Sequence, residues 1–356
     1  MTQLLRDTPR EEWLSLADHP EVRNNGALEQ LSREIDTALD RHPQDTLPLS
    51  LLATNIADSL PEDRYPAVVT AQIRAHAWKD RAQALTFNGK HEEALRAIET
   101  AEKILQLFGT VAHDQAIVWL VKAIALQPLG RLDESLMYLR ASRKIFDEHG
   151  DEKRLVHCAI SEGNLLYRQR NADAASDAYA EALTAAEVLR DPSTLATIHN
   201  NLACCLLEIG QTTEANIHAS SAVAYFNDLG KHVDALRTEL AIGRTLAAKG
   251  QRTEALLRLR QARKNFADRG LAEESAICGL DIAAELLADH REPEARTIFE
   301  EAAAELNATN ERVRVALSSL SEHFAAHDAT PAAVRHVIDY LDTLKREKDS
   351  IFAPVP

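Results

Sequence analysis

The sequence predicts an all-α protein, a right-handed superhelical solenoid built from antiparallel helix pairs. Three observations support this prediction. Aromatic residues make up only 5 % of the 356 residues, with 12 glycines and 12 prolines, which is too few for the strands and turns of an all-β protein. Short segments that end helices recur about every 40 residues. Small residues recur at fixed distances from these segments.

Six positions mark the repeat, and most of them are glycines. The markers are Gly89, Gly130, Arg170, Gly210, Gly250 and His290. Successive markers are 41, 40, 40, 40 and 40 residues apart. Glycine accepts the left-handed backbone conformation that often ends a helix, so each marker is predicted to end the first helix of a pair. A second set of stops, twenty residues further on, ends the second helices: Gly109, Gly150, Arg190, Gly230, Gly270 and Asn310.

Three columns of small residues accompany the markers, seven residues before them and five and twelve residues after them. Their members are Ala82, Ala123, Gly163, Ala203, Gly243 and Ala283; Ala94, Ser135, Ala175, Ala215, Ala255 and Ala295; and Ala101, Ser142, Ala182, Ala222, Ala262 and Ala302. Small side chains let two helices cross closely, because a large side chain would force the backbones apart. A leucine four residues before each marker fills the space beside them.

These stops divide the chain into about eight helix pairs. The expected helices cover 23–41 and 46–60, 66–88 and 90–108, 112–130 and 132–149, 152–170 and 172–190, 192–210 and 212–229, 231–249 and 251–269, 271–289 and 291–308, and 310–327 and 330–348. The first and last pairs fit the columns poorly, as expected of the capping repeats at the ends of an array. We therefore predict one solenoid over 23–348.

Short segments flank this predicted solenoid. Residues 1–22 form an N-terminal extension with a short helix that begins near Pro9, where Thr8 and Glu11 have the spacing of a capping box. Residues 349–356 form an apolar tail that is expected to be extended and to cover the end of the solenoid.

The columns resemble those of the tetratricopeptide repeat (TPR) family over residues 66–348, and loosely over 23–60. Trp78 and Trp119 match the aromatic residue that this family carries early in the first helix, whereas later copies differ there. The repeat of about 40 residues is similar to the long-helix form found in kinesin light chains and bacterial peptide-sensing regulators. The resemblance implies a concave groove, lined by the first helices, that binds a peptide or a helix of another protein.

Polar residues fall at the positions expected to line this groove. They include Lys79, Asp80 and Asp281, and the candidate peptide-binding residues His157, Ser161, Asn164, Arg168, Asn201, Arg237 and Arg244. Some family members hold a partner's terminal carboxylate with five residues from three repeats. Asn164, Asn201 and Arg237 match three of these positions, while Ile160 and Ala241 replace the basic residues at the other two. We expect this cluster to bind a peptide, its carboxylate or an acidic segment; the alternative is a solvated polar face.

Composition and motifs argue against other functions. The chain has 40 Lys and Arg against 55 Asp and Glu, a net charge of −15, which disfavours binding to nucleic acids and to anionic membranes. It contains no GxxxxGK[ST] or GxSxG motif. No signal peptide is visible, and the four cysteines form no CxxC pattern, so we expect a reducing, cytoplasmic setting. We predict no enzymatic activity and no cofactor.

Two weaker candidates remain. His323 and His327 are four residues apart and could face one metal ion, although they are more simply solvated residues of a capping helix. Cys204 is expected on the groove side with His199 nearby, but packing is its simpler role. The predicted function is a non-catalytic scaffold that binds a peptide or helix of a partner protein. The alternative is a regulatory subunit that senses a ligand or peptide and acts through a bound protein.

Overall fold

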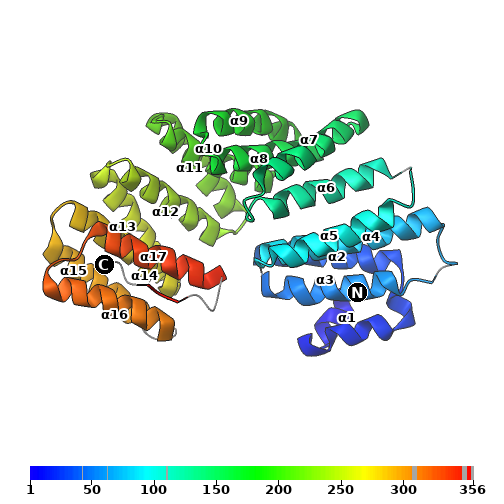
Figure 1. Ribbon diagram of the computed structural model, residues 1–356, viewed down its shortest axis with the longest axis horizontal. Helices are drawn as coiled ribbons and strands as arrows, with labels where there is room; N and C mark the ends of the chain where they lie inside the picture. The colour runs from blue at the N-terminus through cyan, green and yellow to red at the C-terminus, as the bar shows by residue number, and fades with distance from the viewer. Residues whose placement is uncertain (42, 62, 110, 307–310, 347–350, 354–356) are drawn as a thin grey trace. The chain divides into compact units, whose positions relative to one another are not determined.

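The computed structural model describes residues 1–41, 43–61, 63–109, 111–306, 311–346 and 351–353. Over these residues the chain contains helices and no strands, which confirms the predicted all-α fold of helix pairs (Figure 1). The described helices include none with the length and hydropathy needed to cross a bilayer. The chain divides into two compact units, Met1–Gln169 and Arg170–Pro356, which are treated separately below. The boundary falls inside the fourth predicted pair, so a single solenoid over 23–348 stays a prediction.

Unit 1 holds the N-terminal extension and the first helix pairs. Its elements are α1 (Thr2–Asp7), the 3₁₀ helices η1 (Arg10–Asp18) and η2 (Pro20–Val22), α2 (Asn25–Arg41), α3 (Pro43–Asp58), α4 (Ala67–Phe87), α5 (His91–Leu105), α6 (Ala112–Leu126), α7 (Leu132–His149) and α8 (Glu152–Arg168). The predicted capping box is wrong, because Pro9 precedes η1 and no side chain caps that helix.

Unit 2 holds the remaining helices. They are α9 (Ala172–Leu189), α10 (Pro192–Glu208), α11 (Thr212–Asp228), α12 (His232–Ala248), α13 (Arg252–Asp268), α14 (Ala272–Ala288), α15 (Glu292–Leu306), α16 (Glu311–Ala326) and α17 (Pro331–Arg346). In both units the helices follow the predicted order and agree with the predicted ranges to within a few residues.

The marker positions end their helices as predicted. All six have a positive φ, from 58° at His290 to 91° at Gly210, so even the two that are not glycine adopt the left-handed conformation. Among the second stops, Gly150, Arg190, Gly230 and Gly270 are also left-handed. Gly109 is not among the left-handed residues, and α5 ends before it, at Leu105; Asn310 lies outside the described residues.

The small columns lie where helices cross closely. Every member of the three columns is buried. The hydroxyl of Ser135, a column residue in α7, donates a 2.8 Å hydrogen bond to the backbone carbonyl of Ala123, a column residue in α6. This bond joins the two helices of one pair. At Gly243 an added Cβ would lie only 2.9 Å from a methyl carbon of Leu259. The structure therefore confirms that the small columns are buried where helices pack closely.

The first helices of successive pairs contact one another. In unit 1, α4 contacts both α2 and α6, and in unit 2, α12 contacts both α10 and α14. The second helices α5, α11 and α13 make their main contacts with the first helices on either side of them. An array whose helices also meet along one side curves toward that side. We call this side, formed by α2, α4, α6 and α8 in unit 1 and by α10, α12 and α14 in unit 2, the inner face of each unit.

The last pair departs from the repeat. Helix α17 contacts α14 more extensively than it contacts α16, its predicted partner (Figure 1). Its apolar residues, including Val334, Val337 and Leu341, are buried in the core that contains α14. Phe352 of the tail contacts the ring of Tyr340, with ring centroids 5.0 Å apart, so the described part of the tail covers α17. Helix α17 thus covers the end of the inner face of unit 2.

Candidate functional site

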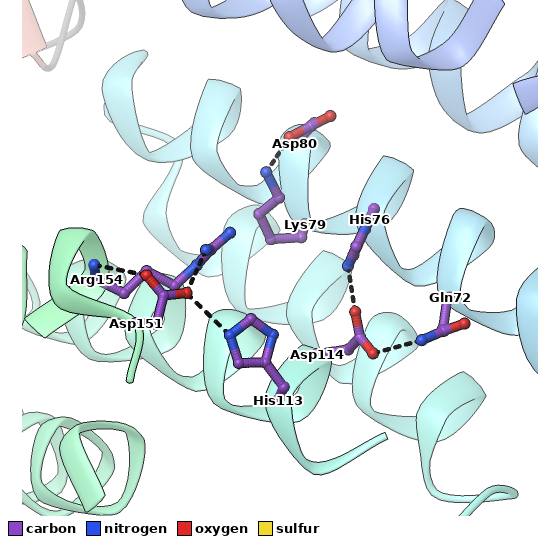
Figure 2. A network of polar contacts seen from close by, with 8 residues as sticks. All are labelled: Gln72, His76, Lys79, Asp80, His113, Asp114, Asp151 and Arg154. Carbon is purple, nitrogen blue, oxygen red and sulfur yellow. Dashed lines mark hydrogen bonds and ion pairs between the residues drawn. The ribbon is translucent and has the colours of Figure 1, made fainter. Parts of the chain in front are cut away.

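A hydrogen-bonded network of polar side chains crosses the inner face of unit 1 (Figure 2). Gln72 and His76 lie four residues apart on α4, and therefore on one side of the helix. His76 Nε2 lies 2.7 Å from one carboxylate oxygen of Asp114 in α6, and Gln72 donates a 2.8 Å hydrogen bond to the other oxygen. Burial alone would raise the pKa of Asp114, but these hydrogen bonds and the nearby His76 bring it below the usual value.

The same kind of contact joins α6 to α8. His113 Nε2 lies 2.9 Å from a carboxylate oxygen of Asp151, the residue that caps α8. Arg154 contacts the same oxygen at 2.7 Å, and its backbone N–H donates to the other oxygen. Burial would raise the pKa of Asp151, but Arg154 and His113 hold it below the usual value. Figure 2 shows both carboxylates with their histidines: one contact joins α4 to α6, and the other joins α6 to α8.

A cavity of about 300 Å³ opens beside this network. Its polar lining residues are Asn25, Glu29 and Ser32 of α2, Gln72, His76 and Asp80 of α4, and Asp114 of α6. Asp80 is buried and contacts Lys79, as Figure 2 also shows. This volume is at the lower end of the range for ligand pockets, so the cavity suits one side chain or a small group.

The inner face of unit 2 has a larger cavity, of about 420 Å³, between α12, α13, α14 and α17. Arg244 Nε lies 2.9 Å from a carboxylate oxygen of Asp281, and Arg335 of α17 lies 2.7 Å from a carboxylate oxygen of Glu285. Burial raises the pKa of Asp281 to about 6; Arg244 opposes this shift, whereas Asp342 and Glu285 add to it. The cavity therefore holds several carboxylates close together.

The candidate peptide-binding residues of unit 1 all lie on α8. Ser161 is only 4 % exposed, and the side chain of Gln127 donates a 3.2 Å hydrogen bond to its backbone carbonyl. His157 and Asn164 are half-buried, and Arg168 is exposed. Ser161 therefore lies beneath the surface that the other three residues reach.

The candidate peptide-binding residues of unit 2 are spread over α10 and α12. Asn200 donates a 3.2 Å hydrogen bond to the side-chain oxygen of Asn201, and Arg237 forms an exposed ion pair with Asp234 at 3.4 Å. Arg244 and Asp281, both predicted to line the groove, line the larger cavity. The predicted carboxylate clamp draws on both units, because Asn164 belongs to unit 1, so its assembly stays a prediction.

Sequence reasoning missed the Gln72–His76–Asp114 network and the part of α17 in the larger cavity. The number of residues between a position and its marker predicts whether that position lies on the inner side of a first helix. This rule correctly predicted that Asp80, Arg244 and Asp281 line the cavities. The rule does not apply to α17, because this helix packs mainly against α14 and not against its predicted partner α16.

No protein-family model and no curated protein matches the chain. Solved structures do share its fold. A signal transduction ATPase of the STAND class with a tetratricopeptide repeat sensor, from Pyrococcus horikoshii, has a TM-score of 0.62 and 12 % identity, covering 96 % of this chain and 48 % of that one. A Rap protein complexed with competence and sporulation factor has a TM-score of 0.53 and 15 % identity, covering 94 % of this chain and 97 % of that one. The apo form of RapI has a TM-score of 0.54 and 16 % identity, covering 78 % and 99 %.

The chain has a TPR-like fold. At these identities the likeness concerns the fold alone, and it confirms the resemblance seen in the small columns.

The two histidines considered for a metal site bind different carboxylates in this TPR-like chain. His323 lies 2.9 Å from Asp328, and His327 lies 2.8 Å from Glu292. In the described ranges, no group of three or more His, Cys, Asp or Glu side chains is placed to hold a metal ion.

The cysteines are expected to react slowly in the native protein. All four are free thiols, and burial raises the pKa of Cys204 to about 11 and that of Cys158 to about 12. His199 is engaged elsewhere, since its Nδ1 lies 2.8 Å from Nδ1 of His218. Ellman's reagent at pH 7.5 should label the native chain far more slowly than the chain in guanidinium, where four thiols react. Rapid native labelling of Cys204 would instead support a reactive thiol.

The lowered pKa of Asp114 predicts a loss of stability in acid. Ionised Asp114 stabilises the folded state fully above about pH 3.9, the ordinary pKa of aspartate in an unfolded chain. This stabilisation is lost as the pH falls through the lower pKa that Asp114 has in the folded chain. Asp114→Asn should therefore lower the Tm at pH 7 and have a much smaller effect at pH 3. Asp147→Asn, at an exposed position of α7, is the control. A Tm difference that stays constant with pH would contradict the prediction.

Proposed function

We propose that the chain is a non-catalytic interaction module that binds a peptide or a helix of a partner protein along its inner faces. One observation carries the proposal: on the inner face of each unit, polar side chains from successive helices are held by hydrogen bonds beside a cavity. Groups that are already held in place lose little conformational entropy when a partner binds. The Rap protein solved with competence and sporulation factor is an example of a complex formed by this fold.

The network of unit 1 suits the recognition of a peptide backbone. The side chain of Asp114 is 12 % exposed, whereas that of His76 is 44 % exposed, so the imidazole faces solvent above a buried anchor. Glutamine and histidine can both donate and accept hydrogen bonds, as peptide N–H and C=O groups require. The proposal keeps Asn164, Arg168, Asn201 and Arg237 as contacts for a partner's carboxylate. A regulatory role would use the same binding step and pass the signal through another bound protein.

A displayed library of random peptides provides the test. Peptides selected on the wild-type chain should bind the Gln72→Ala/His76→Ala variant about ten-fold more weakly, a loss of about 1.4 kcal/mol, as measured by fluorescence polarisation. The control variant, Arg96→Ala/Glu99→Ala, changes exposed residues of α5 and should leave binding unchanged. Circular dichroism checks that both variants fold. Failure to select any peptide, or equal losses in both variants, would contradict the proposal.

The carboxylate contacts are tested with the same peptides. Selected peptides with a free C-terminus should bind more tightly than their amidated forms, and Asn201→Ala/Arg237→Ala should remove that difference. If the variant still binds the free-carboxylate peptides more tightly than the amidated forms, Asn201 and Arg237 do not contact the carboxylate.

A further inference from the structure

We propose that the inner side of α6 in unit 1 binds an amphipathic helix of a partner protein, in the way that α14 of unit 2 binds the chain's own α17. This inference rests on the proposed function. It decides between an extended peptide and a helix, and it names the residues on which the helix docks.

Three apolar side chains follow one another along one side of α6. Ile117, Val121 and Ile124 are four and three residues apart, a spacing that places them in one line on the helix. Ile124 is 37 % exposed, and Ile117 and Val121 are half-buried. We call these three residues the apolar stripe. Helices that lie along one another bury stripes with this spacing.

The repeat shows that the apolar stripe faces inward. Its first two residues hold the repeat positions of His76 and Asp80, thirteen and nine residues before the marker, and both of these line the cavity of unit 1. Its third residue holds the position of Arg244, which lines the cavity of unit 2. Phe87, at the end of α4, is 61 % exposed and holds the position of Ala248 in the same lining. Phe87 therefore adds apolar surface to the inner face.

Unit 2 shows what covers these positions. In α14 they are occupied by Ile277, Asp281 and Ala284. Asp281 and Ala284 line their cavity together with Ile338 of α17, and Ile277 is buried in the core that α17 shares. The stripe positions of α14 therefore lie beneath an amphipathic helix, one that packs mainly against α14.

In unit 1 the same positions carry more apolar side chains but keep part of their surface exposed. The close packing partners of α6 are α4, α5 and α7, all of them members of the repeat. Apolar side chains that gather on an exposed face are typical of a docking surface. The example of α17 on α14 indicates that a helix with one apolar side fits this surface.

Polar side chains flank the apolar stripe on both sides. On α4, the network holds Gln72 and His76 beside it. On α8, Arg168 is exposed near the end of the helix. The polar residues beside the apolar side of a docked helix would meet these groups, and an acidic residue on the flank facing α8 would complement Arg168. Helix α17 carries such a residue, the exposed Asp339, next to the buried Ile338.

The probe is a fluorescein-labelled peptide with the sequence of α17, residues 331–346. It is added to the full chain, which keeps its own α17. A matched probe carries Ile338→Asp/Leu341→Asp, which interrupts the apolar side at the same length. The first probe should bind at least ten-fold more tightly than the second, as measured by fluorescence polarisation. Equal binding of the two probes would overturn the proposal.

Methyl NMR locates the bound probe on the chain. With ¹³C-labelled isoleucine methyl groups, the probe should shift the signals of Ile117 and Ile124. Shifts confined to Ile277 would mean that the probe only replaces the chain's own α17, and would overturn the proposal. The Cα chemical shifts of a ¹³C-labelled probe should become helical on binding. A probe that stays extended at the apolar stripe would overturn the assignment of a helix.

Variants of the chain test the stripe and its flank. Ile124→Asp should weaken the probe at least ten-fold, whereas Met137→Asp, at a residue of α7 that is 55 % exposed, should not. Arg168→Glu should weaken the probe about three-fold at low salt, the size expected of an exposed ion pair. Circular dichroism checks the fold of each variant, and the methyl shifts of the wild-type chain decide the question should Ile124→Asp fail to fold. Full affinity in a folded Ile124→Asp variant would refute the site.

The outcomes separate this inference from its alternatives. If the full chain forms a dimer that Ile124→Asp dissociates, a second copy covers the apolar stripe and the assignment to a partner protein is wrong. If library-selected peptides bind through Gln72 and His76 but bind Ile124→Asp as tightly as the wild type, the apolar stripe is not the site and the proposed function stands. If neither the selected peptides nor the probe bind, the proposed function is wrong as well.

Discussion

Ala262→Leu is expected to lower the free energy of unfolding by about 3 kcal/mol, the upper end of the usual cost of overpacking a core. Ala262 is fully buried on α13, in a cluster with Leu236, Phe266 and Cys278. A larger side chain would have to displace α12 or α14, because the small columns set the distance between helices. Urea unfolding followed by circular dichroism measures the change.

The control for this prediction lies on the same helix. Ala267 is exposed near the end of α13, so Ala267→Leu should change the free energy of unfolding by less than about 0.5 kcal/mol. Similar losses at the two positions would mean that the small columns do not mark close helix crossings.

Phe146→Ala is expected to cost about 3–5 kcal/mol in unit 1, the range for deleting a buried aromatic ring. Phe146 is fully buried on α7, and its ring meets that of His113 edge-on, with centroids 5.6 Å apart. The cavity left by the ring should also loosen His113 from Asp151. Thermal and urea unfolding measure the stability, and the imidazole NMR signals of His113 report the local change.

Met137 provides the matched comparison on α7. This residue is 55 % exposed, so Met137→Ala should leave both the stability and the His113 signals nearly unchanged. A stability loss below about 1 kcal/mol for Phe146→Ala would show that the core of unit 1 collapses around the missing ring.

Most of the fold could be predicted because its two main constraints are local. A close helix crossing requires a small residue at one position, and a helix stop requires one residue in the left-handed conformation. Both requirements recur every 40 residues, so they remain visible even at Arg170 and His290, where glycine is absent. The helix order followed directly from them.

The rest depends on contacts between distant parts of the chain. The apolar residues of α17 predict a buried side but do not say that α14, rather than α16, covers it. A Thr–x–x–Glu spacing is common outside helices, so Thr8 and Glu11 did not fix the structure near Pro9. The distance in sequence from a marker predicts which way a side chain points, but it does not predict how deeply the side chain is buried. For this reason Ser161 was included among the groove residues although it is buried.

The turns at Gly210 and Gly250 are nearly interchangeable. In each, the glycine N–H bonds the carbonyl three residues back, and the following glutamine N–H bonds the carbonyl five residues back. Excising 211–250 would join Gly210 to Gln251 and recreate the same Gly–Gln junction. A gene for such a chain can therefore gain or lose whole blocks of forty codons without a frameshift. The turn at the new junction would have the same sequence and hydrogen bonds as the turns already present.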